Sequence, residues 1–585
     1  MSLNIVGISA FYHDSACCLL KDGEVIAAAE EERFTRIKHD SSFPVNAFKY
    51  CLEAGDISIK DVDCIVYYED PVKKLARQIW SGYDYFGTQY REQMNPNRPD
   101  NAIRNDLGYQ GEIMYLNHHL SHAASTYFYS GFEEAAILTV DGVGEWATTT
   151  YGVGKGNRVE IFEEVDFPNS VGLVYSAFTS YLGFRVNSGE YKVMGLAPYG
   201  EPKYASIIRK MFDFQDNGQY QVDMRYFDFT SEKNMYTQQF IDLFGQPPRA
   251  PESKLDGFYM DVARSLQVVL EEIILKLADY LYQKTHCKNL CLAGGVALNC
   301  VANGVLLKKG PFDNIFVQPA ANDAGSVLGA AAEAYSRITQ RRKRVHKLRN
   351  VFLGPSYTNR EIKDMLDSAS ITYEDYMEND EGLFQRTAEL LAEGKVVGWY
   401  QGRMEFGPRA LGARSILADP RREDMRDKIN QMVKKRESFR PFAPSVLEEE
   451  YKDHFDLKTE SPYMLFTCQV HSPIDMPAIT HVDNSARIQT VNYSENPRYA
   501  NLIKAFFTLS GCPVLLNTSF NVRGEPIVQS PLDALLCFIN TSIDCLVIQN
   551  FIIYRHNNNF TLIKILNKGI RRSRNTIDGI RYTFI

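Results

Sequence analysis

The first part of the chain alternates short apolar runs with polar, turn-forming segments. Asn4–Ser9 has the length and apolar character of a buried strand. Ala16–Lys21 and Glu24–Ala29 flank Asp22-Gly23, a dipeptide typical of a two-residue hairpin turn. Because helical patterns follow such strands farther along the chain, the sequence predicts an α/β protein.

The same order of elements returns later in the chain. Ala135–Val140 is predicted as a buried strand that ends in Asp141-Gly142-Val143-Gly144. The strands Ala147–Tyr151 and Arg158–Val165 follow it. A strand, a polar loop and two more strands thus occur twice, which predicts a duplicated fold with a cleft between its halves.

A third glycine turn follows the strand predicted at Asn289–Ala293 and runs from Gly294 to Asn299. An apolar helix is predicted before this turn, from about residue 258 to residue 282, and an alanine-rich helix after Asp323-Ala324-Gly325.

The composition changes between residues 337 and 349, which include Arg-Arg-Lys-Arg and little apolar material. Such a segment is typical of a solvated linker. A chain of 585 residues also exceeds what one hydrophobic core usually supports. We therefore expect two domains, residues 1–350 and 351–585, the second with strands of its own, including 396–399.

Charge and composition exclude several classes of protein. The net charge is −8, whereas nucleic-acid binding favours a basic surface, so no nucleic-acid partner is expected. The eleven cysteines form no Cys-x-x-Cys pair, which is typical of reduced core residues in a cytosolic protein. Polar residues interrupt the apolar stretch at 536–554, and the first residues do not have the pattern of a signal peptide. We expect a cytoplasmic protein that has no membrane partner.

Two histidines and two aspartates are candidate metal ligands. His118 and His122 are four residues apart, so on a helix they face the same way. Asp141 closes a predicted strand at a glycine turn, and Asp323 directly precedes a predicted helix. Imidazole and carboxylate donors suit Fe2+ or Mn2+ that also holds phosphate oxygens. The alternative is a polar helix face with hydrogen-bonded histidines.

The glycine turns are candidate phosphate-binding loops. Backbone N–H groups at Gly142, Gly144, Gly294 and Gly295 can face an anion, and three such turns after strands favour nucleotide binding. The nearby Lys192 is a candidate to neutralise a phosphate, although a surface lysine fits the sequence equally well.

His13 is a candidate general base. It stands in the first of the two repeated loops, and an imidazole titrates near neutral pH, so it can accept a proton from an acceptor hydroxyl. A lone loop histidine is more often structural.

A basic stretch marks the second domain. Residues 403–440 contain eleven Lys and Arg against six Asp and Glu, interleaved with Phe, Pro and Gly. Arginines among such neighbours are partly buried and need anionic partners such as phosphate or carboxylate. Farther on, Asn517-Thr518-Ser519-Phe520-Asn521 ends the strand predicted at Pro513–Leu516, where hydroxyl and amide groups can complete an anion pocket.

Ten motifs in this order resemble the NodU/CmcH carbamoyltransferase family over nearly the whole chain. The motifs are GISAFYHDSA, EERFTRIKHD, HHLSHAAS, VDGVGE, GEYKVMGLAPYG, GGVALNC, NDAG, GRMEFGPRALGARSI, FRPFAPS and LNTSFN.

The resemblance implies an N-terminal ATPase domain of the actin/sugar-kinase type, as in the tRNA-threonylcarbamoylation protein, and a C-terminal YrdC-like domain. It also implies ATP-dependent O-carbamoylation of a small hydroxyl-bearing acceptor by carbamoyl phosphate, through carbamoyladenylate. Fe2+ is the metal expected first, with Mn2+ and Mg2+ as alternatives, and the resemblance leaves a homodimer open.

The resemblance assigns roles residue by residue. It implies that His13 is the catalytic base and that His118, His122, Asp141 and Asp323 bind the metal. For the nucleotide we expect Gly142, Gly144, Lys192, Gly294, Gly295 and Asn299. For carbamoyl phosphate we expect Arg414, Lys434, Arg440, Arg487, Ser519 and Asn521.

Two other functions compete with this interpretation. A tRNA-threonylcarbamoylation-type enzyme is disfavoured by the second domain and by the acidic net charge. A nucleotide-dependent regulator or chaperone on the same ATPase fold would not need the carbamoyl phosphate segments at 403–440 and 517–521.

Overall fold

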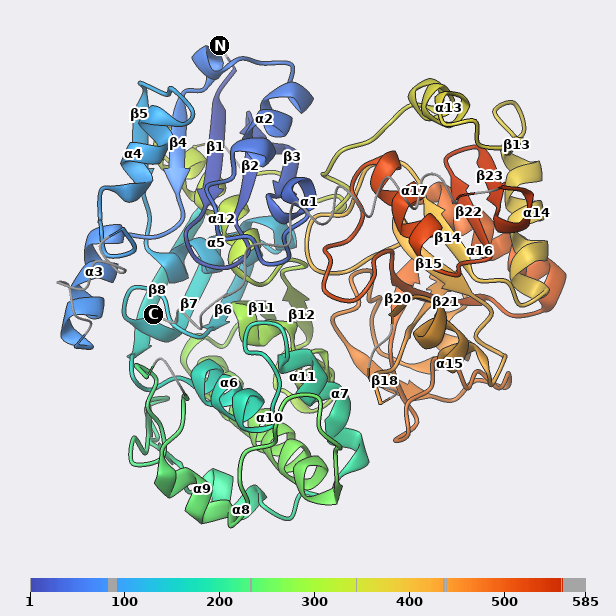
Figure 1. The fold of residues 1–585 in the computed structure, drawn as a ribbon. Helices are drawn as coiled ribbons and strands as arrows, with labels where there is room; N and C mark the ends of the chain where they lie inside the picture. The colour runs from blue at the N-terminus through green and yellow to red at the C-terminus, as the bar shows by residue number, and fades with distance from the viewer. Residues whose placement is uncertain are drawn as a thin grey trace. The chain divides into compact units, whose positions relative to one another are not determined.

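The computed structural model of the protein describes residues 2–82, 92–231, 234–342, 345–434, 437, 439–558 and 560 (Figure 1). The described residues form two compact units. The N-terminal unit runs to Thr35 and continues over His39–Arg349, and the C-terminal unit contains Arg36–Lys38 and the residues from Asn350 onward. None of the helices in the described ranges is long and apolar enough to cross a membrane.

The N-terminal unit is built on two five-stranded sheets that repeat one strand order. The orders are β3-β2-β1-β4-β5 and β8-β7-β6-β11-β12. In both sheets the first three strands along the chain pair antiparallel, and the last two are added in parallel. The duplicated α/β fold predicted from the sequence is confirmed by this repeat. The strands are β1 (Asn4–Ser9), β2 (Ala16–Lys21), β3 (Glu24–Glu30), β4 (Cys64–Tyr67), β5 (Glu112–Tyr115), β6 (Glu134–Val140), β7 (Ala147–Lys155), β8 (Arg158–Asp166), β11 (Asn289–Ala293) and β12 (Asn314–Val317).

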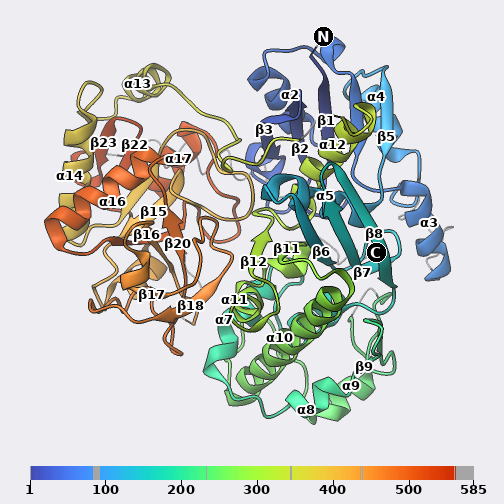
Figure 2. The same cartoon turned by 180° about the vertical axis from the view of Figure 1, so that it is seen from behind.

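Two helices lie between these sheets. Helix α12 (Asp323–Ile338) packs on β1 and β2, helix α5 (His118–Ser130) packs on β6 and β11, and the two helices pack on each other (Figure 2). Small residues allow this close approach: a Cβ at Gly329 of α12 would lie 1.9 Å from the carbonyl oxygen of Ser121. Asn117 caps the start of α5 by accepting a hydrogen bond from Leu120 N, and Gly131 ends the helix with a φ of 81°. The packing brings the first turns of both helices to the end of β6.

Other helices cover the outer faces of the sheets. Helix α2 packs on β2 and β3. The long helix α10 packs on β6, and it also contacts helices α6, α7, α8 and α11. The sequence predicted α10 from about 258 to 282, and the structure extends it to Gly257–Thr285. The remaining elements of this unit are α1 (Glu32–Thr35), α2 (Val45–Ala54), α3 (Pro71–Trp80), α4 (Arg98–Asn105), α6 (Val171–Tyr181), α7 (Glu190–Leu196), α8 (Ala205–Arg209), β9 (Phe212–Phe214), β10 (Tyr220–Val222), α9 (Gln238–Phe244) and α11 (Cys300–Lys309).

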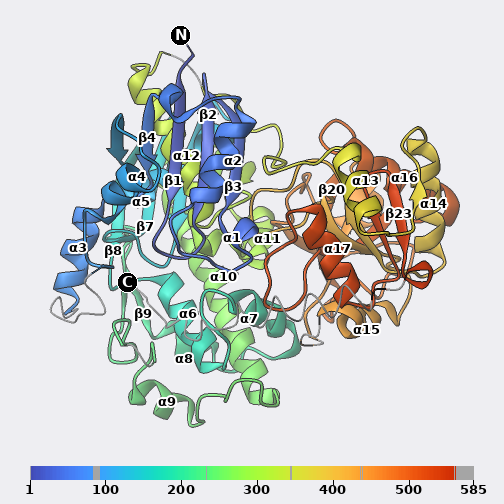
Figure 3. The same cartoon turned by 45° about the horizontal axis from the view of Figure 1, so that its top comes forward.

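The C-terminal unit is built on a mixed eight-stranded sheet of order β13-β23-β22-β14-β15-β21-β16-β20. A three-stranded sheet, β17-β18-β19, accompanies it. Helices α14 and α16 pack side by side (Figure 3), and α17 packs on β14 and β22. The elements are α13 (Asn359–Ser368), β13 (Glu374–Asp375), α14 (Asp380–Ala392), β14 (Val397–Tyr400), β15 (Arg414–Ala418), α15 (Met425–Ile429), β16 (Ala443–Leu447), β17 (Phe455–Asp456), β18 (Thr467–Val470), β19 (Ser485–Arg487), β20 (Gln489–Val491), α16 (Pro497–Ser510), β21 (Val514–Ser519), α17 (Pro531–Asn540), β22 (Cys545–Ile548) and β23 (Phe551–Tyr554).

Two segments differ from the sequence-based expectation. Helix α12 continues to Ile338, so the expected linker at 337–349 begins within a helix. Strand β21 continues to Ser519, so the polar residues expected after the strand form its last part. Residues 561–585 lie outside the described part of the chain.

Candidate functional site

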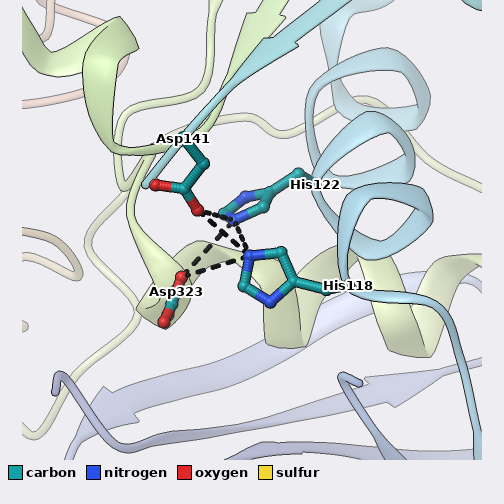
Figure 4. Close-up of side chains that lie close together, drawn as sticks. All are labelled: His118, His122, Asp141 and Asp323. Atoms are coloured by element: carbon teal, nitrogen blue, oxygen red, sulfur yellow. Dashed lines mark hydrogen bonds and ion pairs between the residues drawn. The ribbon is translucent and has the colours of Figure 1, made fainter. Parts of the chain in front are cut away.

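Four side chains from three elements meet in the N-terminal unit (Figure 4). His118 and His122 come from the first turns of α5, Asp141 follows β6, and Asp323 is the first residue of α12. The Nε2 atoms of the two histidines are 3.1 Å apart. Asp141 Oδ2 lies 3.0 Å from His118 Nε2 and 3.2 Å from His122 Nε2, and Asp323 Oδ1 lies 3.7 Å and 3.4 Å from the same two atoms. The predicted ligand set is therefore brought together.

The cluster is buried and electrostatically coupled. Both imidazoles and Asp323 are almost fully enclosed. Burial disfavours protonation of His122, but hydrogen bonds and charges from Asp141 and Asp323 outweigh it and raise its pKa to about 9. Burial also opposes ionisation of Asp141, yet the two histidines hold its pKa well below the usual value. The Asp141 carboxylate is thus charged at neutral pH.

The donor set fits a divalent cation. All four ligand atoms lie within 4.8 Å of one another, and two nitrogens with two carboxylate oxygens suit Fe2+ or Mn2+. Asp323 Oδ2 is buried and has no hydrogen-bond partner among the described residues. An unpaired carboxylate oxygen in such a place is costly without a cation nearby.

Glycine N–H groups hold the other oxygen of Asp141. Gly142 N donates to Asp141 Oδ1 over 2.8 Å, and Gly295 N donates to the same atom over 3.0 Å. The sequence predicted that these N–H groups face a nucleotide phosphate. In the structure they fix the Asp141 carboxylate, so that its Oδ2 points to His118 and His122.

The other residues expected to bind nucleotide have local partners. Gly144 N donates to Ala147 O. Gly294 has a φ of 90°, and it lies close to the backbone of Val140. Asn299 caps α11 through Ala302 N and exchanges hydrogen bonds with Gln267. Lys192 Nζ lies 5.4 Å from the centroid of the Phe184 ring. Their nucleotide roles remain predictions.

Glu145 is a site residue that the sequence reasoning did not single out. Its carboxylate accepts hydrogen bonds from the backbone N–H groups of His118 and Asp70, and its side chain is almost fully enclosed. It therefore ties the start of α5 to the segment after β4. The only sequence signal was its place in the motif VDGVGE.

His13 lies beside the cluster. Its Nδ1 is 2.8 Å from Asp14 Oδ2, and Asp14 also contacts His39 and accepts a hydrogen bond from Asn322, the neighbour of Asp323. Burial disfavours the imidazolium, but Asp14 and, farther away, Asp323 and Asp141 raise the pKa of His13 to about 9. The hydrogen bond to Asp14 leaves Nε2 as the atom that can face a substrate.

The C-terminal unit brings three of its predicted residues together. Lys434 ends a π-helical turn over Asn430–Lys434. Its ammonium group lies 3.2 Å from Ser519 Oγ and 2.8 Å from Asn521 Oδ1, and it also donates to the carbonyl oxygens of both residues. A buried cation, a hydroxyl and an amide thus share one location.

The three predicted arginines of this unit have different surroundings. Arg414 is fully buried over the Tyr400 ring, and its terminal nitrogens donate to the carbonyl oxygens of Gln401, Gly402, Ala413 and Pro355. The sequence predicted anionic partners, whereas the observed partners are backbone carbonyls. Arg440 lies 3.9 Å from Glu437, and Arg487 ends β19 with a buried Nε that has no hydrogen-bond partner in the described ranges.

Family models match both units. The model described as Carbamoyltransferase N-terminus matches residues 4–332, and the model described as Carbamoyltransferase C-terminus matches residues 388–555. The chain belongs to the carbamoyltransferase family. The predicted family resemblance is confirmed, and members of this family are enzymes that transfer carbamoyl groups.

Relatives within the carbamoyltransferase family include a nodulation protein and a named O-carbamoyltransferase. An uncharacterized protein of Synechocystis is 47% identical over 594 residues, 94% of this chain and 96% of that protein. Nodulation protein NolNO of Sinorhizobium fredii is 39% identical over 563 residues, 93% of this chain and 79% of that protein. The 3'-hydroxymethylcephem-O-carbamoyltransferase of Amycolatopsis lactamdurans is 38% identical over 247 residues, 42% of this chain and 45% of that protein.

Proposed function

We propose that this carbamoyltransferase uses ATP and carbamoyl phosphate to carbamoylate a hydroxyl group of a small molecule, with carbamoyladenylate as the intermediate. The observation that supports this proposal most directly is the convergence of four candidate metal ligands beside His13 within one unit. These ligands are His118, His122, Asp141 and Asp323. The two repeated sheets support an ATPase fold of the actin/sugar-kinase type for that unit. For the C-terminal unit we propose a YrdC-like fold.

The first half-reaction is assigned to carbamoyl phosphate and ATP. Water hydrolyses carbamoyl phosphate to inorganic phosphate and carbamate, and the carbamate oxygen then attacks the α-phosphorus of ATP and releases pyrophosphate. Lys434, Ser519 and Asn521, with Arg440 and Arg487, are proposed to hold carbamoyl phosphate, because cations and hydroxyl groups recognise phosphate oxygens. Adenylation gives the carbamoyl carbon a better leaving group.

The second half-reaction is assigned to the N-terminal unit. His118, His122, Asp141 and Asp323 would hold Fe2+, or Mn2+ or Mg2+ in its place, and such a cation supplies positive charge that stabilises phosphate oxygens. His13 Nε2 accepts the proton of the acceptor hydroxyl while the oxygen attacks the carbamoyl carbon and AMP leaves. Such a cation would neutralise the charges of Asp141 and Asp323, which raise the pKa of His13. The pKa of His13 would then fall toward the range of a general base.

One assay tests the proposal. The protein is incubated with ATP and carbamoyl phosphate, first without an acceptor and then with candidate alcohols and sugars. We expect pyrophosphate release that requires both substrates, and a mass gain of one carbamoyl group on an acceptor. Absence of pyrophosphate release in the metal-loaded protein contradicts the proposed intermediate.

A further inference from the structure

A cavity opens in the N-terminal unit beside Tyr12. It is lined by the loop after β1, by the end of β4 with α3, and by the segment that leads into α4. Its lining side chains include Phe11, Tyr12, Tyr67, Glu69, Lys74 and Arg98. Three aromatic rings thus form walls of a cavity that also contains charged groups.

The cavity adjoins the candidate site. Tyr12 lines it, and the Tyr12 ring centroid is 4.2 Å from that of His13. A molecule in the cavity would therefore have one end near His13.

The charges in the cavity do not cancel. Lys74 Nζ and Glu69 Oε1 form an ion pair of 2.7 Å, so these two groups compensate each other. Arg98 is half-buried, and its guanidinium stacks on the Phe11 ring 3.9 Å from the centroid. Among the described residues no carboxylate forms an ion pair with this guanidinium, and the exposed Glu92, which does not line the cavity, acts on it from farther away. The cavity lining itself therefore carries one more positive than negative charge.

We propose that this cavity binds the carbamoyl acceptor, and that the acceptor carries an oxyanion group, a carboxylate or a phosphate, which pairs with Arg98. The inference rests on the proposed function and names the substrate class of the same site. Arg98 fits this role because a planar guanidinium donates two parallel hydrogen bonds to such a group, and it already lies over the Phe11 ring on the cavity wall. The aromatic walls contact the body of the acceptor, and its hydroxyl faces His13.

Matched probes test this proposal on the full-length, metal-loaded protein by calorimetry. One set is glucose, glucuronate and glucose 6-phosphate, and the other is 1,4-benzenedimethanol and 4-(hydroxymethyl)benzoate. We expect at least one anionic probe to bind at least 10-fold more tightly than its neutral counterpart. The sugar set distinguishes a carboxylate from a phosphate. Equal binding of all anionic and neutral counterparts overturns the proposal.

Variants of Arg98 test whether this side chain causes the preference for anionic probes. Arg98→Gln should weaken binding of the preferred anion by roughly 10- to 100-fold, because it removes a charge-assisted hydrogen bond, and Arg98→Lys should restore part of it. Lys73→Gln, which removes an exposed charge on the same wall helix α3, should leave binding unchanged. An anion preference that persists in Arg98→Gln, or that Lys73→Gln abolishes equally, contradicts the proposal.

The two proposals fail in different ways. Pyrophosphate release without acceptor reports formation of carbamoyladenylate, whereas calorimetry with the anionic probes reports binding at Arg98. If the wild-type protein releases no pyrophosphate, the proposed carbamoyladenylate is wrong, while anion-selective binding at Arg98 is still measured by calorimetry. If pyrophosphate release is normal but no anion preference is found, only the acceptor class is wrong.

Discussion

His118 packs directly against Gly144: a Cβ at position 144 would lie 3.0 Å from the Cβ, Cγ and Cδ2 atoms of His118. The imidazole therefore occupies a space that only a glycine leaves open. Since Asp141 is three residues earlier and is held by Gly142 and Gly295, the same loop sets the positions of two candidate ligands.

The first prediction follows from this contact. Gly144→Ala should displace the His118 ring by a few tenths of an ångström and lower metal affinity by roughly 10-fold, within the range seen when the support of a ligand is removed. Metal titration followed by elemental analysis measures it. Gly257→Ala is the control, because a Cβ there meets no atom within 4 Å. An unchanged metal affinity in Gly144→Ala would show that the His118 ring can move without weakening metal binding.

The second prediction concerns the ligand itself. His118→Ala should lower bound metal and abolish carbamoyl transfer, because the remaining groups cannot hold the cation in place. Metal content per chain and acceptor carbamoylation are measured on the same sample, with the thermal midpoint as a check on folding. A variant that is fully loaded and fully active would remove His118 from the ligand set.

The third prediction is a pH dependence. His13 must be unprotonated to accept the acceptor's proton, and Asp14, Asp323 and Asp141 raise its pKa to about 9 against the opposing effect of burial. A cation held by Asp323 and Asp141 would bring this pKa below 9, so transfer by the metal-loaded protein should accelerate with rising pH and level off below that value. His13→Asn should remove that rise and slow transfer by roughly 10²- to 10⁴-fold, with acceptor-independent pyrophosphate release unchanged. An equal fall in both reactions would assign His13 a structural role.

The fourth prediction separates two arginines of the C-terminal unit. Arg414→Met leaves several buried carbonyl groups without a donor, so it should lower the free energy of unfolding by about 3–5 kcal/mol. Arg440→Ala should weaken use of carbamoyl phosphate by about 2–3 kcal/mol and change stability little. Denaturant unfolding and the carbamoyl phosphate dependence of pyrophosphate release distinguish the two. Loss of ATP affinity in Arg440→Ala would contradict separate substrate sites.

Local patterns in the sequence predicted much of the N-terminal unit. Strands β1, β2 and β11 have the predicted bounds, because short apolar runs between turn residues leave few alternatives. The repeated order of strands could be predicted from the sequence for the same reason. The pairing of β1 with β4 and of β6 with β11 was not predicted, because parallel pairing joins segments far apart in the chain and leaves no periodic signal.

The site was predicted less completely than the strands. The spacing of His118 and His122 was sufficient to place them on one helix face, and Asp141 and Asp323 followed from strand and helix ends. The hydrogen bond from Gly295 to Asp141 spans 154 positions, so glycine spacing could not distinguish it from a phosphate contact. Arg414 shows a similar limit: apolar neighbours indicated burial, but a guanidinium is satisfied equally well by carbonyl oxygens.

The repeated sheets have a consequence for how the two loops can change. In a symmetric pair of identical chains, every substitution would alter both copies of a loop at once. Here the loop after β1 carries Tyr12, His13 and Asp14, while the loop after β6 carries Asp141 and its glycines. Because both copies lie in one polypeptide, each loop can be mutated alone. Substitutions can therefore alter the loop of His13 without changing the residues of the candidate ligand set.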